Sequence, residues 1–211
     1  MKGILRLLHR SVRSNPAARE PSDSVFFSTA FAGQDAGEAA PTPWEARAVE
    51  VGAQAFSASA GSRLLQTLWA QDPCMALLDA EAIGQLAPFL QFVQVAAQRD
   101  VIRQGEYGNF MVVLLSGAMA VDRTQPWGET LRLAQSRPGD ILGEMSLLDG
   151  GVRFSSCTTL SDCRMAVLSA DAMDHMLDSA PPLAASLVAL LSRKISLRLR
   201  AVSMRLSECP P

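Results

Sequence analysis

Glycines interrupt the middle of this chain at close intervals, between short runs of apolar or alternating residues. Phe110 to Leu115 is continuously apolar, whereas Glu129 to Ala134 alternates polar and apolar side chains. A continuous run indicates a fully buried strand, and alternation indicates a strand with one buried face. The glycines between the runs are Gly105, Gly108, Gly117, Gly128, Gly139, Gly150 and Gly151. Short strands joined by tight glycine turns predict a small antiparallel β-roll over residues 90–168.

The segment before the roll divides into two parts. Residues 1–60 are rich in Ala, Gly, Ser and Pro without a sustained period, so they bury too little apolar surface to offset the entropy of ordering. We predict a disordered or loosely ordered N-terminal tail there. A helical period of apolar residues begins near Ser62, and Asp72-Pro73 interrupts it, because proline disfavours helix in the residue before it. Short helices are therefore expected within residues 62–88.

Two helices are predicted after the roll, over residues 170–206, with 207–211 as a tail. Ser169 suits the N-cap of the first helix, since its hydroxyl can accept a hydrogen bond from a free backbone N–H. A seam with alternating spacings of four and three runs along the second helix at Val188, Ser192, Ile195, Leu199, Val202 and Leu206. Such a seam fits a homodimer that pairs two copies of the helix through residues 183–206. One helix packed on its own roll needs the same stripe, and we favour the dimer.

Composition limits the class of protein. With 211 residues, the chain can hold one domain with a good core and an appendage. The net charge of −2 argues against a body that binds nucleic acid strongly. The four cysteines lack metal-ligand spacing, and we interpret them as reduced thiols of a cytoplasmic protein. The sequence also lacks the phosphate-loop, nucleophile and zinc motifs of common enzymes, so we expect no metal site and no catalysis.

The first 13 residues are basic, with Ile4, Leu5, Leu7, Leu8 and Val12 at helical spacing. Such a segment can lie on a membrane surface or dock on a partner as an amphipathic helix. It can also be an unstructured basic leader, which is the simpler interpretation. It lacks the uninterrupted apolar run of a signal peptide, and no run in the chain approaches the roughly 18 apolar residues of a transmembrane helix.

One stretch of the predicted roll, Gly139 to Ser156, suits a ligand that carries both sugar hydroxyls and a phosphate. A single carboxylate, Glu144, and a single arginine, Arg153, stand at the two ends of its central loop. A carboxylate accepts hydrogen bonds from hydroxyls, and a guanidinium pairs with phosphate oxygens through its rigid fork of donors. Small residues after the arginine leave backbone N–H groups free to contact an anion.

This stretch resembles the phosphate-binding cassette of the cyclic nucleotide-binding domain family, which includes catabolite activator protein and the regulatory subunits of protein kinase A. The matching positions are Gly143, Glu144, Ser146, Leu147, Leu148, Arg153 and Ser155. Val101 to Glu106, Phe110 to Gly117 and Ala120-Val121 resemble the family's early strand, glycine turn and hairpin. The resemblance covers roughly residues 62–206 and implies a domain over 61–206. Its fold would be mainly β with flanking α: an antiparallel, jelly-roll-like β-roll between N-terminal helices and a C-terminal short-plus-long helix pair.

The resemblance also implies roles for residues of the cassette, which we define as residues 143–155. Glu144 would accept the ribose hydroxyl beside Gly143, Arg153 would pair with the cyclic phosphate, and Ser155 would add a donor. The candidate ligand-binding residues are Gly143, Glu144, Met145, Ser146, Arg153, Phe154, Ser155 and Arg198.

Three of these positions leave alternatives open. Phe154 departs from the family pattern, which places a small residue after the arginine; it can stack on the base, point away and enlarge the site, or fill the pocket. Met145 and its neighbour Leu147 are expected in the core rather than against the ligand. Arg198 falls at a base-facing position of the long helix, where it could bond a guanine edge or a second phosphate. Solvent exposure is the simpler interpretation of Arg198.

We therefore expect a stand-alone cytoplasmic regulatory protein that binds a cyclic nucleotide, with no prosthetic group. cAMP is the default ligand, and cGMP and cyclic di-GMP are alternatives. Binding would change the packing of the C-terminal helices and thereby signal to an unidentified effector protein. The rival is a roll that keeps the fold without the ligand and serves as a protein-interaction module. Relatives that regulate transcription carry a helix-turn-helix after the long helix, where this sequence has only residues 207–211, so we expect no DNA binding.

Overall fold

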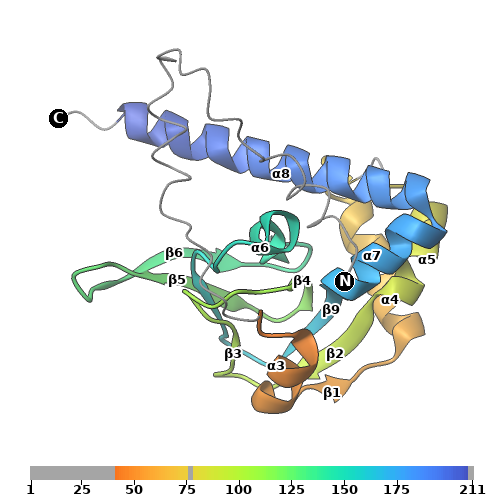
Figure 1. Cartoon of the computed structure of the whole chain (residues 1–211), viewed down its shortest axis with the longest axis horizontal. Coiled ribbons are helices and arrows are strands. Elements are labelled where there is room, and N and C mark those ends of the chain that lie inside the picture. The colour runs from red at the N-terminus through yellow and green to blue at the C-terminus, as the bar shows by residue number, and fades with distance from the viewer. Residues whose placement is uncertain (1–40, 76–77, 209–211) are drawn as a thin grey trace, which may run out of the picture.

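Two antiparallel sheets form a β-roll at the centre of the fold, and helices cover one end of it (Figure 1). This computed structural model describes residues 41–75 and 78–208, without the side chains of Leu206 and Glu208. One sheet has the strand order β1-β2-β9-β4-β7 and the other has the order β3-β8-β5-β6. The strands are β1 (Gln54–Ala55), β2 (Gln91–Val95), β3 (Asp100–Ile102), β4 (Phe110–Ser116), β5 (Met119–Thr124), β6 (Thr130–Ser136), β7 (Ile141–Leu142), β8 (Ser156–Thr159) and β9 (Cys163–Ser169). The predicted antiparallel roll is confirmed.

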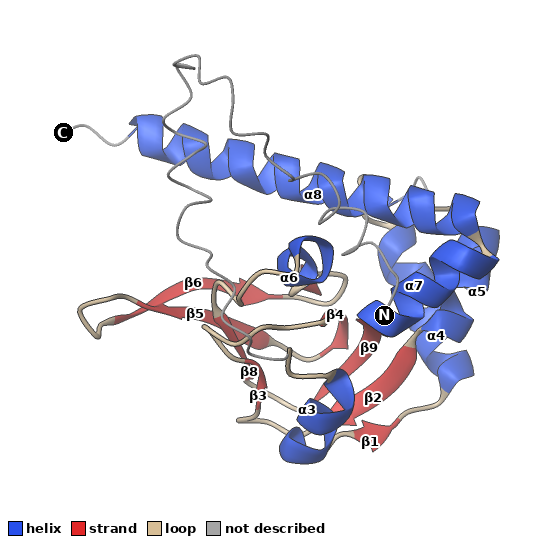
Figure 2. Ribbon diagram, viewed as in Figure 1, coloured by secondary structure: helices blue, strands red, loops and turns tan. Residues whose placement is uncertain are grey.

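Helices precede and follow the roll, and one short helix interrupts it (Figure 2). They are α3 (Trp44–Val51), α4 (Ala58–Ala70), α5 (Ala80–Leu86), the 3-10 helix η2 (Ala87–Phe89), α6 (Glu144–Asp149), α7 (Ala170–Ser179) and α8 (Pro181–Glu208). The backbone N–H of Ala172 donates to Ser169 Oγ at 3.2 Å, which confirms the predicted cap of α7. Helix α4 starts four residues before the expected Ser62, because Ser57 caps it. It ends at Ala70, ahead of Asp72-Pro73 as expected.

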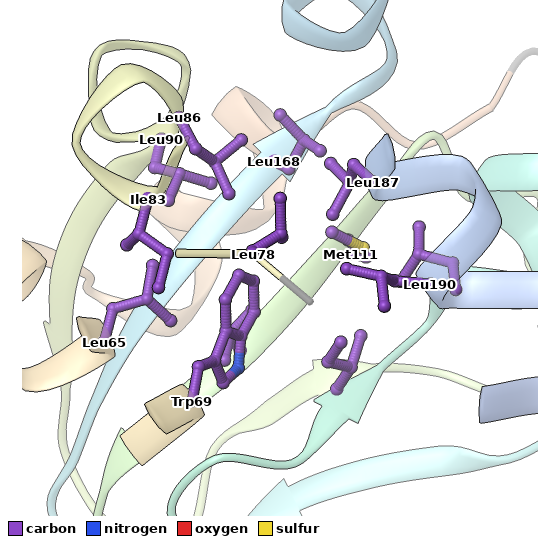
Figure 3. Close-up of a cluster of buried hydrophobic side chains, with 14 of the residues drawn as sticks. Leu65, Trp69, Leu78, Ile83, Leu86, Leu90, Met111, Leu168, Leu187 and Leu190 are labelled. Carbon is purple, nitrogen blue, oxygen red and sulfur yellow. The ribbon is translucent and has the colours of Figure 1, made fainter. Parts of the chain in front are cut away.

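Strand β4 separates two hydrophobic cores. Met111, Val113 and Leu115 belong to a core that the sheet shares with the helices. Figure 3 shows part of it, with Trp69 of α4 and Leu187 of α8 among the labelled side chains. Phe110, Val112 and Leu114 alternate with them and fill the interior of the roll. Both faces of β4 are therefore buried, which explains its continuous apolar run.

The prediction of a loosely ordered tail over 1–60 is wrong for residues 41–60, where α3, β1 and the start of α4 are ordered. Trp44 and Val51 of α3 are buried in the interior core of the roll. These two side chains supply the apolar surface that the composition argument missed. Residues 1–40, including the basic segment 1–13, lie outside the described residues.

Helix α8 packs on its own domain through a different stripe from the predicted seam. Its buried residues are Leu183, Ala184, Leu187, Leu190 and Leu191. Of the seam positions whose side chains the structure describes, only Val188 packs against this core, whereas Ser192 is exposed and Leu199 is 65% exposed. The interpretation that the seam packs on its own roll is therefore wrong at Ser192 and Leu199, and the dimer stays a prediction. Among the described residues, no helix is long and apolar enough to span a membrane.

Strand β6 also differs from expectation. Its alternation predicts one buried face, but Leu131 and Leu133 are both exposed. The reason is its position at the edge of the second sheet, where the hairpin of β5 and β6 projects from the roll (Figure 1).

Candidate functional site

A cavity of about 540 Å³ lies between the roll, the cassette and the second half of α8. Its walls come from β3, β5, β6 and β7 of the roll, from α6 and residues 153–157, and from α8. All eight candidate ligand-binding residues line it. The tertiary structure thus brings Arg198, far along the chain, to the same space as the cassette.

Gly143 lines this cavity and allows Arg153 to approach the backbone closely. It precedes α6 with φ 79°, a left-handed conformation that glycine adopts without steric cost. A Cβ there would lie 2.6 Å from Arg153 Nη1 and 2.9 Å from Ile102 Cδ1. A glycine is therefore needed both for the turn and for the close approach of the arginine.

Arg153 is held rigidly and is only 4% exposed. Its Nη1 donates to Gly143 O at 2.8 Å and its Nη2 donates to Phe110 O at 2.6 Å. Its guanidinium carbon lies 4.6 Å from the centroid of the Phe110 ring. Across the residues that the structure describes, no carboxylate lies within 4 Å of this guanidinium. Burial lowers the pKa of Arg153 to about 10, so the group still carries its charge at neutral pH.

A buried cation without a counter-ion favours an anionic ligand, because burying an unpaired charge is costly. The cavity beside Arg153 has room for one. The cassette arginine therefore has the geometry expected of a phosphate-binding group.

Glu144 opens α6 and is 3% exposed. Arg198 Nη1 forms an ion pair with Glu144 Oε1, and Arg198 Nη2 donates to Ile141 O at 2.9 Å. Arg198 is exposed, as the simpler interpretation expected, with 48% of its side chain accessible, but that interpretation missed its ion pair with Glu144. The long helix inserts a cation at the carboxylate that the resemblance assigns to the ribose.

Phe154 does not fill the cavity, because its side chain is 52% exposed. The Arg123 guanidinium lies 3.8 Å from the centroid of its ring, and Arg123 Nη1 donates to Phe154 O at 2.7 Å. These contacts hold the ring at the edge of the site. The plugged pocket of the rival interpretation is not what the structure contains.

The remaining cassette residues divide between core and cavity. Leu147 is buried in the helix-covered core, as expected. Met145 is 47% exposed and lines the cavity, so its expected core position is wrong. Ser146 is buried and Ser155 is partly buried, and both line the cavity.

Sequence reasoning missed several residues that build the site. Ile102, Val121, Leu133, Leu142 and Cys157 form its apolar wall. The alternation of apolar residues along the strands could have marked these positions as candidates for the cavity wall. Alternation alone, however, does not show which face of a strand lines a cavity. Burial raises the pKa of the Cys157 thiol to about 12, so Cys157 acts here as a neutral wall residue. Gly108 was also missed: a Cβ there would overlap the Arg153 guanidinium.

Residues 92–180 match the family model described as "Cyclic nucleotide-binding domain". This segment has the cyclic nucleotide-binding fold. Over 118 residues, the chain is 30% identical to a CRP-like cAMP-activated global transcriptional regulator of Mycobacterium tuberculosis, covering 56% of this chain and 53% of the relative. Over 97 residues it is 32% identical to a cyclic AMP receptor protein of Thermus thermophilus, covering 46% of this chain and 45% of the relative. The chain thus spans about half the length of these curated relatives.

A solved structure supports the same fold. It is a cyclic nucleotide-binding domain from Methylobacillus flagellatus, which covers 75% of this chain and 89% of its own with a TM-score of 0.67 and 22% identity. At this identity the likeness concerns the fold alone. The implied β-roll with flanking helices is confirmed.

Proposed function

We propose that this protein is a regulatory protein that binds a cyclic nucleotide in the cavity between the cassette and α8. The observation that carries the proposal is the buried, unpaired Arg153 at the wall of a cavity that also holds Glu144. The guanidinium would pair with the cyclic phosphate, and the carboxylate would accept the ribose hydroxyl. Ser146 and Ser155 would complete the polar contacts. We propose cAMP as the ligand, because one curated relative is described as cAMP-activated and the other as a cyclic AMP receptor protein.

Helix α8 is the proposed output element. Its second half is tied to the domain by Arg198 and, one turn earlier, by Lys194, whose Nζ lies 2.6 Å from Asp72 Oδ2. A ribose hydroxyl at Glu144 would compete with Arg198 for the same carboxylate. Ligand binding would therefore favour a state in which the second half of α8 is released from the cassette. This is a shift between two states with different ligand affinity, and an effector protein would bind one of them.

Calorimetric titration of the purified protein with cAMP, cGMP and cyclic di-GMP in parallel tests the proposal. We expect binding in the micromolar range or tighter to cAMP. Tighter binding to one of the other two would keep the site and change the ligand. No heat with any of the three, from a protein with a cooperative thermal transition, would contradict nucleotide binding and favour the protein-interaction module.

Replacement of Arg198 by glutamine tests the competition at Glu144. A half-exposed ion pair contributes about 0–1 kcal/mol, so its loss should lower the Kd for cAMP by up to about fivefold. Amide hydrogen exchange over 194–208 should become faster in the variant, as in the ligand-bound wild type. Arg200→Gln, at an exposed position of the same helix, is the matched control. A higher Kd in Arg198→Gln would instead make Arg198 a direct ligand contact.

Several other expectations stay predictions. They are the homodimer, the cytoplasmic location, the absence of catalysis, the absence of DNA binding and the identity of the effector.

A further inference from the structure

Helix α3 lies outside the segment that matches the family model, yet it contacts the loop that supports Arg153. The Trp44 ring meets the Phe110 ring edge-on, with centroids 5.2 Å apart. Phe110 is the residue whose ring and carbonyl both contact the Arg153 guanidinium. An element before the family segment therefore buttresses the anion site.

A second contact from α3 is electrostatic. Arg47 is 1% exposed and binds two carboxylates, Glu50 at 2.6 Å and Glu106. Glu106 belongs to the strand-like segment that pairs with Arg153: its carbonyl accepts the Arg153 N–H at 2.8 Å. Just before α3, the Thr42 N–H donates to Tyr107 O at 2.8 Å. Residues 42–47 are thus attached to the loop 105–110 at several points.

Two buried cations, Arg47 and Arg153, lie near the Glu106 carboxylate. Glu106 is close enough to raise the pKa of Arg153, and Arg47 is close enough to lower it, although burial is the largest influence on that pKa. The carboxylate of Glu106 pairs with Arg47 and, more distantly, with Arg103 at 3.9 Å, and not with Arg153. A carboxylate paired with Arg153 would oppose a phosphate at the same guanidinium. The location of the Glu106 charge therefore affects how readily Arg153 accepts an anion.

We propose that Arg47 is a positioning residue of the anion site, which holds the Glu106 carboxylate away from Arg153 and so keeps Arg153 available for phosphate. This inference rests on the proposed function, since the phosphate is that of the cyclic nucleotide. If α3 is withdrawn, Glu106 is released to Arg153 and ligand affinity falls. Helix α3 is then a second element, besides α8, whose contacts set the affinity.

A rescue experiment separates positioning from simple packing. The Kd for cAMP is measured by calorimetry for the 211-residue wild-type chain, Arg47→Gln, Glu106→Gln and the double variant. Arg47→Gln should raise the Kd roughly fivefold or more, because the freed Glu106 pairs with Arg153. Glu106→Gln alone should stay within about twofold of wild type, and the double variant should return to that level. A double variant as weak as Arg47→Gln would overturn the proposal.

Glu50→Gln is the matched control, because it removes the other carboxylate partner of Arg47 and leaves Glu106 in place, although Glu50 also pairs with Arg103. It should leave the Kd within about twofold of wild type. An equal loss in Glu50→Gln and Arg47→Gln would mean that the ion network only stabilises α3, which contradicts the proposal. If Arg47→Gln does not fold, Arg47→Lys carries the same comparison, because it keeps the charge but lacks the two-pronged guanidinium.

An NMR measurement on the ligand-free protein tests the role of Arg47 without relying on nucleotide binding. In protein labelled with ¹⁵N-arginine, the Nε–Hε signal of Arg153 is assigned with Arg153→Lys. This Arg153 signal should shift in Arg47→Gln, because the freed Glu106 carboxylate approaches the guanidinium. In the double variant it should return toward its wild-type position. If the wild type binds no nucleotide, the proposed function fails, but this signal still decides the role of Arg47. An Arg153 signal unchanged by Arg47→Gln would overturn it.

Discussion

Replacement of Arg153 by alanine should weaken cAMP binding by at least about tenfold. A hydrogen bond to a charged group contributes roughly 1.5–3 kcal/mol, and each 1.4 kcal/mol is about tenfold in Kd. Arg153 is the only arginine of the cassette, and its guanidinium is fixed before binding by the carbonyls of Gly143 and Phe110. Little ordering entropy is then lost when a phosphate binds, so most of the interaction should appear as affinity.

Two further variants make this result specific. Arg153→Lys keeps a positive charge but cannot hold both carbonyls and a phosphate, so its Kd should lie between those of wild type and Arg153→Ala. Arg63→Ala, at an exposed position of α4 outside the cavity, should bind as wild type does. Thermal melts should accompany the titrations, because the alanine removes the two hydrogen bonds from the guanidinium to the carbonyls of Gly143 and Phe110 and should lower stability. Unchanged affinity in a folded Arg153→Ala protein would contradict the phosphate assignment.

Replacement of Glu144 by alanine should also weaken cAMP binding by at least about tenfold, by the same estimate for a charged hydrogen bond. This variant has a second effect, since it also removes the ion pair with Arg198. Without ligand, amides in the second half of α8 should therefore exchange faster than in wild type. One substitution is thus expected to uncouple the helix and to lose the ligand.

Calorimetry and hydrogen exchange on the same samples check both effects. Glu144→Gln keeps an acceptor for the ribose hydroxyl but weakens the hold on Arg198, so its affinity loss should be smaller while α8 still loosens. Glu129→Ala, in an exposed turn outside the cavity, is the control. Wild-type affinity in Glu144→Ala would remove this carboxylate from the site. Unchanged exchange over α8 would show that the Arg198 contact does not hold the helix.

The two ends of the cassette therefore have different tasks in this proposal. Arg153 is preorganised by contacts inside the roll and with residues next to α3. Glu144 is already paired with the output helix α8. The binding energy gained at Arg153 can offset the cost of breaking the ion pair between Glu144 and Arg198. Ligand affinity is thereby coupled to the position of α8.

The local features of this fold follow from the amino-acid sequence by itself. Glycine turns and apolar runs determine strands and their ends, because strand length and side-chain alternation are properties of neighbouring residues. The cap at Ser169 and the break at Asp72-Pro73 are equally local, and the structure has both where they were expected. The spacing of Glu144 and Arg153 indicated the cassette for the same reason.

Only the tertiary structure decided which face of each helix and strand is buried and what packs against it. Periodicity shows that residues share a face, but not what lies opposite it. Helix α8 could bury either of two stripes, and it uses Leu187 and Leu191 rather than the seam that contains Leu199. Strand β6 has a regular alternation, yet Leu131 and Leu133 are both exposed.

The pairs that complete the site also depend on tertiary packing. Arg198 is 54 positions from Glu144, and Arg47 is 59 positions from Glu106. No local pattern marks such partners, since an arginine on a helix is suited to solvent as well as to a carboxylate. Packing of α3 against β3 and its following loop, and of α8 over α6, brings these charges together. The sequence thus determined the cassette, and the docking of two distant helices decided how its charges are held.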